Sequence, residues 1–292
     1  MQLNETFKNG LVEFIRRTST ELPDDVVQAL IRARNQEAPN SAAEGALKTI
    51  LHNVDLSRQM TSPICQDTGT LVFYVDHPSG VSTLQMRKLI QEAVAEATAK
   101  SYLRPNAVDS LTGKNSGNNL GKEFPVFHFE EWEEPYLRMR LLLKGGGSEN
   151  VGAQYSLPDT RLGADRNLAG VKKVVLDAVY QAQGQGCAPG VLGIGIGGDR
   201  ETSFMISKKQ FFRKLDDKNP IPELAKLEEE ILEKANQLGI GPMGFGGKTT
   251  LLGVKADWAH RLPACFFVSI SYLCWAGRRR TMMFRDGKVE FD

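Results

Sequence analysis

The amino-acid sequence predicts a mixed α+β fold, in which a helical N-terminal segment precedes interleaved strands and helices. Apolar residues recur at helical spacing through roughly the first 60 residues. Beyond them, short β-branched and aromatic runs alternate with further helical patterns. Glycine clusters interrupt these patterns, mostly where an expected strand begins or ends. We therefore expect glycine-rich loops that converge on one edge of the core.

Three amphipathic helices are expected at the N-terminus. The first covers residues 3–18, the second opens at Pro23, and the third begins near Ser41. We assign no chemistry to these helices. Residues 1–60 are interpreted as a helical cap on a core of residues 61–292, within a single domain that takes in the whole chain.

The remaining elements follow from changes in hydrophobic period. Strands are expected where β-rich runs lie between turn residues, and helices where apolar residues recur every three to four positions. Between the two expected helices that flank it, the glycine-rich stretch alternates glycine with Ile and Leu, as a strand does. The expected strands otherwise cover 71–75, 126–129, 136–143 and 265–273, and the expected helices cover 84–99, 168–183, 208–214 and 225–238.

Composition excludes several classes of protein. The chain has 292 residues, with 36 Lys and Arg against 35 Asp and Glu and a net charge of +1. A dedicated nucleic-acid binder would be basic, so the charge balance disfavours that class. No run of about 18 apolar residues predicts a transmembrane helix, and the N-terminus shows no signal-peptide cleavage pattern. We predict a cytoplasmic enzyme.

Cysteine usage excludes a disulfide scaffold. Four cysteines, Cys65, Cys187, Cys265 and Cys274, are too few for a chain of this length. No two of them form a C-x-x-C pair, which excludes a zinc ribbon and a ferredoxin-type run. A site assembled from single cysteines in distant loops stays open.

The stretch 183–200 holds seven glycines around Cys187. A dinucleotide-binding loop follows a strand, opens a helix and has an acidic residue about 20 positions further on. Here an expected helix precedes the glycines instead. Three interpretations remain: a phosphate-binding loop, a packed glycine turn without a ligand, and a loop that presents Cys187 to a metal or cluster. We favour the third.

Polar groups gather where a turn leads into the first expected strand. Cys65, Gln66 and Asp67 stand side by side there, and loops at strand ends often present functional groups. An Asx-type turn with a buried cysteine explains the same residues. Arg104 precedes a proline, which favours an extended backbone. Its guanidinium suits a carboxylate substrate, and a solvated arginine is the commoner case.

Three later segments have two interpretations each. Gly145–Gly147 follow a strand and could form a nest of backbone N–H groups for an anion, or a flexible loop. The glycine cluster 239–250 contains Gly-Lys-Thr, but Pro242 stands where a Walker A loop needs glycine. Arg278–Arg280 could neutralise an anionic cluster or substrate, or form a solvated strand end.

Six ordered motifs together resemble class I fumarate hydratase and L-tartrate dehydratase, in their alpha-type catalytic portion. The likeness extends from about residue 40 to about residue 285. Six motifs in one order are far more specific than any single one. The motifs are Pro63–Gly69, Leu103–Asn106, Lys144–Asn150, Gly186–Gly190 with Gly195–Arg200, Gly241–Thr250, and Cys274–Ala276 with Arg278–Arg279.

This resemblance implies an oxygen-labile 4Fe-4S hydro-lyase, and makes residues 61–292 a cluster-binding core. In that family three cysteines hold three irons, and the fourth iron stays open to the substrate. The ligands implied here are Cys65, Cys187 and Cys274. Cys265 is the spare thiol, expected as a buried apolar residue on its strand.

The resemblance also implies the residues around the substrate. The open iron would act as a Lewis acid on the departing hydroxyl group, while arginine and glycine N–H groups would hold the carboxylates. We find no convincing base for the C3 proton in this sequence. The implied substrate-binding residues are Gln66, Asp67, Arg104, Gly146 and Gly147, and the candidates for catalytic proton transfer are Asp67 and His260.

A partner is implied as well. In single-chain members of the family a beta-type portion follows, whereas this sequence ends at Asp292. We therefore expect an alpha subunit of a hetero-oligomer that is inactive, or nearly so, without a separate beta subunit. The expected reaction is (S)-malate to fumarate and water. L-tartrate dehydration and a non-catalytic iron–sulfur module are the alternatives, and a P-loop-like nucleotide enzyme is weakened by its spacing.

Overall fold

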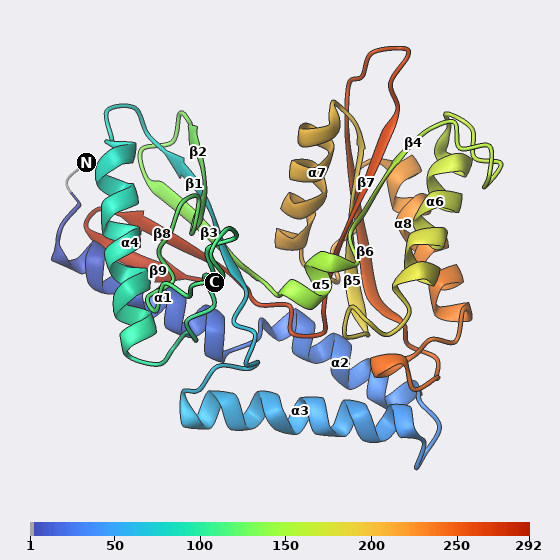
Figure 1. Cartoon of the computed structure of the whole chain (residues 1–292), viewed down its shortest axis with the longest axis horizontal. Coiled ribbons are helices and arrows are strands. Elements are labelled where there is room, and N and C mark those ends of the chain that lie inside the picture. The colour runs from blue at the N-terminus through green and yellow to red at the C-terminus, as the bar shows by residue number, and fades with distance from the viewer. Residues whose placement is uncertain (1–2) are drawn as a thin grey trace. The chain divides into compact units, whose positions relative to one another are not determined.

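A computed structural model describes residues 3–292 and confirms the expected α+β class (Figure 1). The chain divides into two compact units, each with its own sheet and hydrophobic core. The division into a helical cap and a single core stays a prediction. The first unit comprises the chain up to Pro23, Asn53–Gly146 and Arg278–Asp292, and the second comprises Asp24–His52 and Gly147–Gly277.

The first unit is built on a five-stranded sheet in the order β2-β1-β3-β8-β9. Strands β1 and β2 are parallel, and the other neighbours are antiparallel. Two helices, α1 and α4, contact each other and cover this sheet. The elements are α1 (Glu5–Thr20), β1 (Thr70–His77), α4 (Thr83–Ala99), β2 (Val126–Glu131), β3 (Leu137–Lys144), β8 (Arg279–Arg285) and β9 (Lys288–Phe291).

Alternation along β1 separates the two faces of this sheet. Leu71, Phe73 and Val75 lie in the core to which α1 and α4 also contribute, as the two-residue period of a strand requires. Asp76 therefore points to the opposite face, where its carboxylate lies 2.8 Å from Arg138 Nε and 3.3 Å from Arg140 Nη2. Burial of this apolar face fixes the register of β1, and thereby the position of the loop that precedes it.

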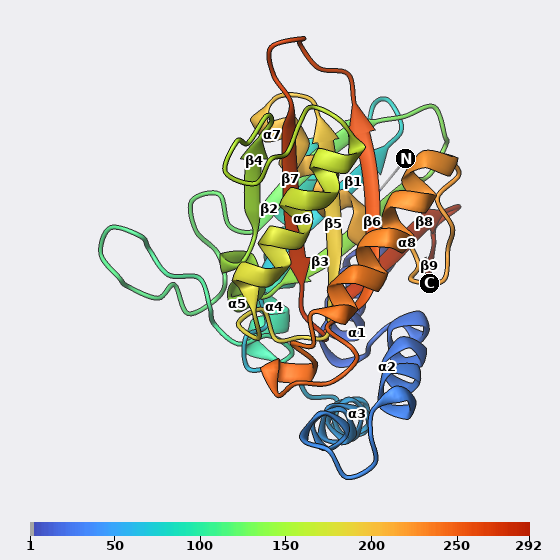
Figure 2. The same ribbon diagram turned by 90° about the vertical axis from the view of Figure 1, so that its right-hand side faces the viewer.

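The second unit has a four-stranded sheet in the order β4-β7-β5-β6, in which only β5 and β6 run parallel. Helices α6 and α8 lie together on one face, toward the viewer in Figure 2, and α7 lies on the other. Helix α3 (Ala42–Met60) begins in this unit and ends in the first. The other elements are α2 (Asp24–Gln36), α5 (Gly146–Asn150), β4 (Ala153–Ser156), α6 (Leu168–Ala182), β5 (Gly190–Gly197), α7 (Arg200–Lys209), α8 (Pro222–Gln237), β6 (Leu251–Ala259) and β7 (Phe267–Leu273).

Helix α7 corrects one expected boundary. The sequence predicts a helix at 208–214, whereas α7 begins at Arg200 and ends at Lys209. Asp199 is its N-cap, because the Asp199 side chain accepts a 2.7 Å hydrogen bond from the backbone N–H of Thr202. The helix therefore starts directly after the glycine-rich strand β5. Strands β4, β6, β8 and β9 have no counterpart among the expected strands.

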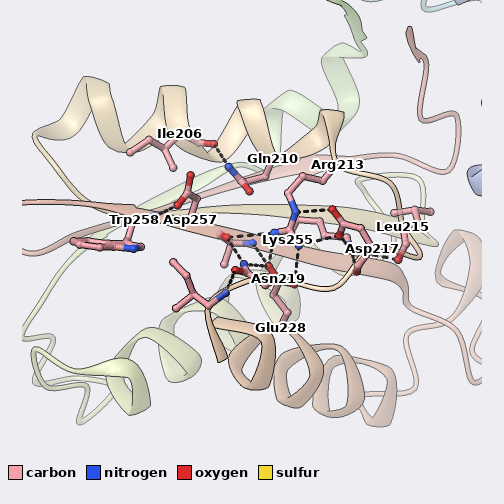
Figure 3. A network of polar contacts seen from close by, with 12 residues as sticks. Ile206, Gln210, Arg213, Leu215, Asp217, Asn219, Glu228, Lys255, Asp257 and Trp258 are labelled. Atoms are coloured by element: carbon pink, nitrogen blue, oxygen red, sulfur yellow. Dashed lines mark hydrogen bonds and ion pairs between the residues drawn. The ribbon is translucent and has the colours of Figure 1, made fainter. Parts of the chain in front are cut away.

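A buried polar network fixes the edge of the second sheet that is formed by β6 (Figure 3). Glu228 on α8 accepts hydrogen bonds from the backbone N–H of Ala256, at 2.7 Å, and from Arg213 Nη1, at 2.6 Å. Lys255 on the edge strand β6 is 3% exposed, and its Nζ lies 2.6 Å from Asp217 Oδ1. Two cations face two carboxylates, so this network balances its own charge.

Candidate active site

Asp67 joins two loops of the first unit. Its Oδ1 accepts a 2.9 Å hydrogen bond from the backbone N–H of Gly69, and its Oδ2 accepts a 2.7 Å bond from the N–H of Gly146. The first bond is the Asx-type turn considered from the sequence. The second is a contact across 79 positions that the sequence does not reveal. The carboxylate of Asp67 is therefore held at both oxygens while its side chain stays partly exposed.

Glycine is required at position 69. Gly69 has φ +82°, in the left-handed region, and a Cβ there would stand 2.8 Å from the backbone of Lys144. The loop before β1 thus lies directly on the end of β3. Its other side is fixed by the N–H of Ile64, which donates to the carbonyl of Ser19 at 3.0 Å.

Hydrogen bonds hold the backbone of Arg104 beside this loop. The hydroxyl of Thr68 accepts from the N–H of Arg104, at 3.3 Å, and from Asn106 Nδ2, at 3.1 Å. Asn119 Nδ2 in turn donates to the carbonyl of Arg104 at 2.8 Å. The Arg104 side chain itself is exposed. Its backbone is therefore held in place while its guanidinium is presented to solvent.

The sequence left two interpretations of Gly145–Gly147, a nest of N–H groups for an anion and a flexible loop, and the structure places a helix start here. The chain enters the short helix α5 at Gly146, and the Gly146 N–H already donates to Asp67. This N–H therefore binds a carboxylate oxygen of the chain itself, that of Asp67, and not one of a substrate. Gly147 lies in the second unit, where a Cβ would stand 3.8 Å from the carbonyl oxygen of Gln185.

In the second unit, Cys187 and Cys274 lie on adjacent segments. The N–H of Trp275 donates to the carbonyl of Cys187 at 3.2 Å, and the N–H of Cys187 donates to the carbonyl of Gly184 at 3.1 Å. Cys187 has φ +57°, which an ordinary residue adopts only where its surroundings hold it there. Both thiols are partly exposed at the end of the sheet where β5 begins and β7 ends.

The glycines around Cys187 make room for protein atoms. A Cβ at Gly186 would stand 2.7 Å from the ring of Tyr272, and one at Gly190 would stand 2.3 Å from it. Along β5, a Cβ at Gly193 or Gly195 would stand 2.0 Å from a backbone oxygen of α7. The glycines of β5 therefore allow the close approach of helix α7, which occupies the space beside them.

Tyr272 lies beside both of these cysteines. The side chain is 2% exposed, and its hydroxyl has no hydrogen-bond partner among the described residues. Burial raises the pKa of this hydroxyl, and the proximity of Cys274 and Cys187 raises the pKa further. The hydroxyl therefore stays protonated at neutral pH and is available as a donor.

His260 and Cys265 lie at the opposite end of this sheet. The carbonyl of His260 accepts a 3.2 Å hydrogen bond from the N–H of Gly198, just past β5. At about 3.3 Å of rise per residue, β5 separates His260 from Cys187 by roughly 20 Å or more. The structure thus does not bring His260 to the two cysteines of this unit. Cys265 precedes β7 and is partly exposed, so its expected place as a buried residue on that strand is wrong.

An apolar cavity of about 590 Å³ lies at the same end as His260. It is lined at the carboxyl ends of the parallel strands β5 and β6 and at the starts of α6 and α8. His260, Trp258 and Phe266 are among its lining residues. It belongs to the second unit alone.

The predicted cluster ligands are shared between the units. Cys65 is in the first unit, and Cys187 and Cys274 are in the second. Among residues 3–292, no three His, Cys, Asp or Glu side chains are grouped closely enough to hold a metal ion. The assignment of the three cysteines as ligands stays a prediction.

No helix in the described part of the chain is long and apolar enough to cross a membrane. The predicted location in the cytoplasm stays a prediction.

Comparison with known proteins gives the family. The family model described as fumarate hydratase (fumerase) matches residues 8–283. A putative class I fumarate hydratase of Geobacillus stearothermophilus is 51% identical over 94% of this chain, which spans only 54% of that protein's length. A putative L(+)-tartrate dehydratase subunit alpha of Methanocaldococcus jannaschii is 35% identical, and the match covers 92% of this chain and 94% of that protein's length. The L(+)-tartrate dehydratase subunit alpha of Escherichia coli is 31% identical, and the match covers 94% of this chain and 89% of that protein's length. The resemblance found in the six motifs is confirmed, and the chain belongs to the fumarate hydratase (fumerase) family.

Proposed function

We propose that the chain is the alpha-type catalytic part of an iron–sulfur hydro-lyase that reversibly dehydrates (S)-malate to fumarate and water. The observation that carries this proposal is a convergence in the first unit. Loops far apart in the sequence bring Asp67, Arg104 and Gly146 to one place, beside the exposed Gln66. These are positions that the family resemblance assigns to the substrate. The higher identity to the relative named as a fumarate hydratase favours malate over L-tartrate.

Arg104 is the proposed partner of a substrate carboxylate. Its backbone is fixed on both sides, by Thr68 and by Asn119, whereas its side chain is exposed. A guanidinium presents parallel N–H groups that match the two oxygens of a carboxylate. Holding the backbone still lowers the entropy that is lost when the side chain closes on the substrate.

Asp67 is the proposed proton carrier at the substrate hydroxyl. Each of its oxygens accepts one backbone N–H, and a carboxylate oxygen has two lone-pair directions. One direction on each oxygen therefore stays available for a substrate hydroxyl or for a proton. The two backbone bonds fix the orientation of the carboxylate before the substrate binds.

Cys65, Cys187 and Cys274 are the proposed ligands of a 4Fe-4S cluster. Thiolates are the usual protein ligands of such clusters, and the chain offers partly exposed thiols at all three positions. The backbone bond between Cys187 and Trp275 supports the pairing of two of them. When bound, the cluster would supply a Lewis acid that favours departure of the hydroxyl group.

We further propose a beta-type partner, carried on a separate subunit. Two of the relatives are named as alpha subunits, and the fumarate hydratase relative extends well beyond the matched region. No base for the C3 proton is evident among the residues that converge with Asp67. The partner would supply that base, together with further groups for the second carboxylate.

Anaerobic reconstitution with iron and sulfide tests the proposal. We expect broad visible absorbance typical of a thiolate-held cluster, perturbed by (S)-malate more strongly than by L-tartrate. A stronger response to L-tartrate would favour the tartrate dehydratase alternative. Absorbance without any response to either acid would favour a non-catalytic iron–sulfur module. Turnover of malate should require an added beta-type partner, and robust turnover by the chain alone would overturn the partner proposal.

A further inference from the structure

Arg278 is a buried cation without a full set of partners. Its side chain is 1% exposed, and its Nε and Nη1 have no hydrogen-bond partner among residues 3–292. The residue stands directly before β8, and its carbonyl accepts a 3.0 Å hydrogen bond from the N–H of Leu143 on β3. The backbone is thus fixed, and the guanidinium is the part that lacks partners.

Such a group needs an explanation. Buried polar atoms nearly always have a partner in folded proteins, and a buried charge left uncompensated costs several kcal/mol. The second unit shows the usual arrangement, since the buried Lys255 has its carboxylate partner in Asp217 (Figure 3). Among residues 3–292, no carboxylate forms an equivalent ion pair with Arg278. The missing partner is therefore expected to be an anion that binds to the chain.

The position of the guanidinium indicates where that anion binds. A Cβ built on Gly145 would stand 3.2 Å from Asp67 Oδ2 and 3.7 Å from Arg278 Nη2. Asp67 and Arg278 therefore both lie against this one glycine, which joins β3 to Gly146. A side chain at position 145 would occupy the space between the carboxylate and the guanidinium. Arg278 is thus part of the same loop cluster as Asp67, within the first unit.

We propose that Arg278 is a further substrate-binding residue, whose guanidinium pairs with one carboxylate of the dicarboxylate substrate. This inference rests on the function proposed above. It gives the buried guanidinium beside Asp67 and Gly145 an anionic partner, because a dicarboxylate substrate brings a carboxylate that the described residues do not supply to Arg278. The Arg104 side chain is exposed, whereas the Arg278 side chain is buried.

The test compares malate with its two single-carboxylate fragments, (S)-lactate and 3-hydroxypropanoate. Each ligand is titrated into the anaerobically reconstituted full chain at constant ionic strength, because salt screens charge pairs. Affinity is measured from the ligand-dependent rise in unfolding temperature. In Arg278→Gln, affinity for malate should fall about 30-fold or more. The fragment that keeps the carboxylate paired with Arg278 should lose affinity as malate does. The affinity for the fragment that lacks this carboxylate should stay unchanged.

Two further variants serve as controls. Arg278→Lys keeps the charge but loses the planar pair of donors, so the same pattern should appear with a smaller loss. If Arg278→Gln does not fold, this milder variant decides the question. Arg285→Gln removes an exposed guanidinium at the far end of β8, the strand that follows Arg278, where it stacks on Tyr136. This variant should leave all three affinities unchanged.

Several results would overturn the proposal, and they are distinguishable from failure of the proposed function. Wild-type affinities that are equal for malate and both fragments would refute the proposed function itself. Tight malate binding that Arg278→Gln leaves unchanged, or an equal loss for all three ligands, would refute only the role of Arg278. Inorganic phosphate bound as tightly as malate, and equally dependent on Arg278, would show a general anion site instead.

Discussion

Replacing Gly195 by alanine tests whether the glycines of β5 serve helix packing or a ligand. Gly195 lies in the middle of β5, and α7 crosses that face of the sheet. A Cβ at this position would stand 2.0 Å from the carbonyl oxygen of Ser203 and 3.0 Å from the backbone nitrogen of Ser207. Ser203 also donates its hydroxyl to the carbonyl of Gly195 at 3.0 Å. The strand and the helix therefore meet backbone to backbone.

The expected loss of stability follows from this geometry. Carbon and carbonyl oxygen approach no closer than about 3.3 Å in favourable contacts, so α7 must move away by about 1.3 Å. The clashing atoms belong to the helix backbone, and a change of side-chain rotamer therefore cannot relieve the contact. Overpacking a core costs about 1–3 kcal/mol and occasionally more. We expect Gly195→Ala to lower the free energy of unfolding by about 3 kcal/mol.

Gly45→Ala provides the matched control. Gly45 lies in α3, and a Cβ there would meet nothing within 4 Å. Alanine is favoured over glycine in helices by up to about 1 kcal/mol, so this variant should be slightly more stable than the wild type.

Urea unfolding followed by far-ultraviolet circular dichroism measures both changes, and an iron assay after reconstitution accompanies it. We expect the midpoint to fall for Gly195→Ala and to rise slightly for Gly45→Ala. The reasoning is refuted if Gly195→Ala unfolds at the wild-type urea concentration but no longer incorporates iron. Gly195 would then serve a ligand and not the packing of α7.

Three further predictions concern single side chains. Cys187→Ser should abolish the incorporation of iron and sulfide, whereas Cys265→Ser should leave it unchanged, and equal iron contents in the two variants would contradict the ligand assignment. Tyr272→Phe removes a buried hydroxyl that has no hydrogen-bond partner in the described structure. The free energy of unfolding of the cluster-free chain should therefore stay the same or rise by up to about 1 kcal/mol, and a clear fall would show that the hydroxyl is hydrogen-bonded. Hydrogen bonds from Arg16 lower the pKa of Glu13 from 4.5 to about 2. The Glu13 carboxylate therefore favours folding above about pH 4.5 and loses this effect as the pH falls toward 2. Glu13→Gln should flatten that part of the curve of urea midpoint against pH.

Much of the helical structure was predictable from local pattern. Helices α1, α4, α6 and α8 begin and end within three residues of the positions that periodicity indicates. Each buries an apolar stripe against a sheet, and a stripe of this kind is visible in the sequence itself. The motif resemblance likewise singled out Asp67 and Arg104, which the fold then brings together.

Other features depend on contacts between distant parts of the chain. The Gly145–Gly147 segment has the composition of an anion-binding nest, but Asp67 takes the Gly146 N–H. Strand β6 follows a glycine cluster, and it carries a buried Lys255 and an exposed Asp257. Its sequence pattern is therefore not that of an apolar strand. Arg278 is one member of a basic triplet in the sequence, and all three arginines are buried. Arg278 is set apart because its Nε and Nη1 both lack a hydrogen-bond partner within the described part of the chain.

The glycine-rich stretch illustrates how packing within the chain can fix the position of a proposed ligand, Cys187. On one side of Cys187, Gly186 lies against the ring of Tyr272, and on the other side Gly190 lies against the same ring. Cys187 itself is fixed through both its N–H and its carbonyl, the latter by Trp275. The close approach of Tyr272 requires glycine at both flanking positions, because a Cβ at either one would clash with it. These contacts are all made between residues of the chain itself, so the backbone of Cys187 is placed by the fold. The glycines are thus best explained by the rigidity that they give to this position, since preorganised ligands bind without the entropic cost of ordering a loop.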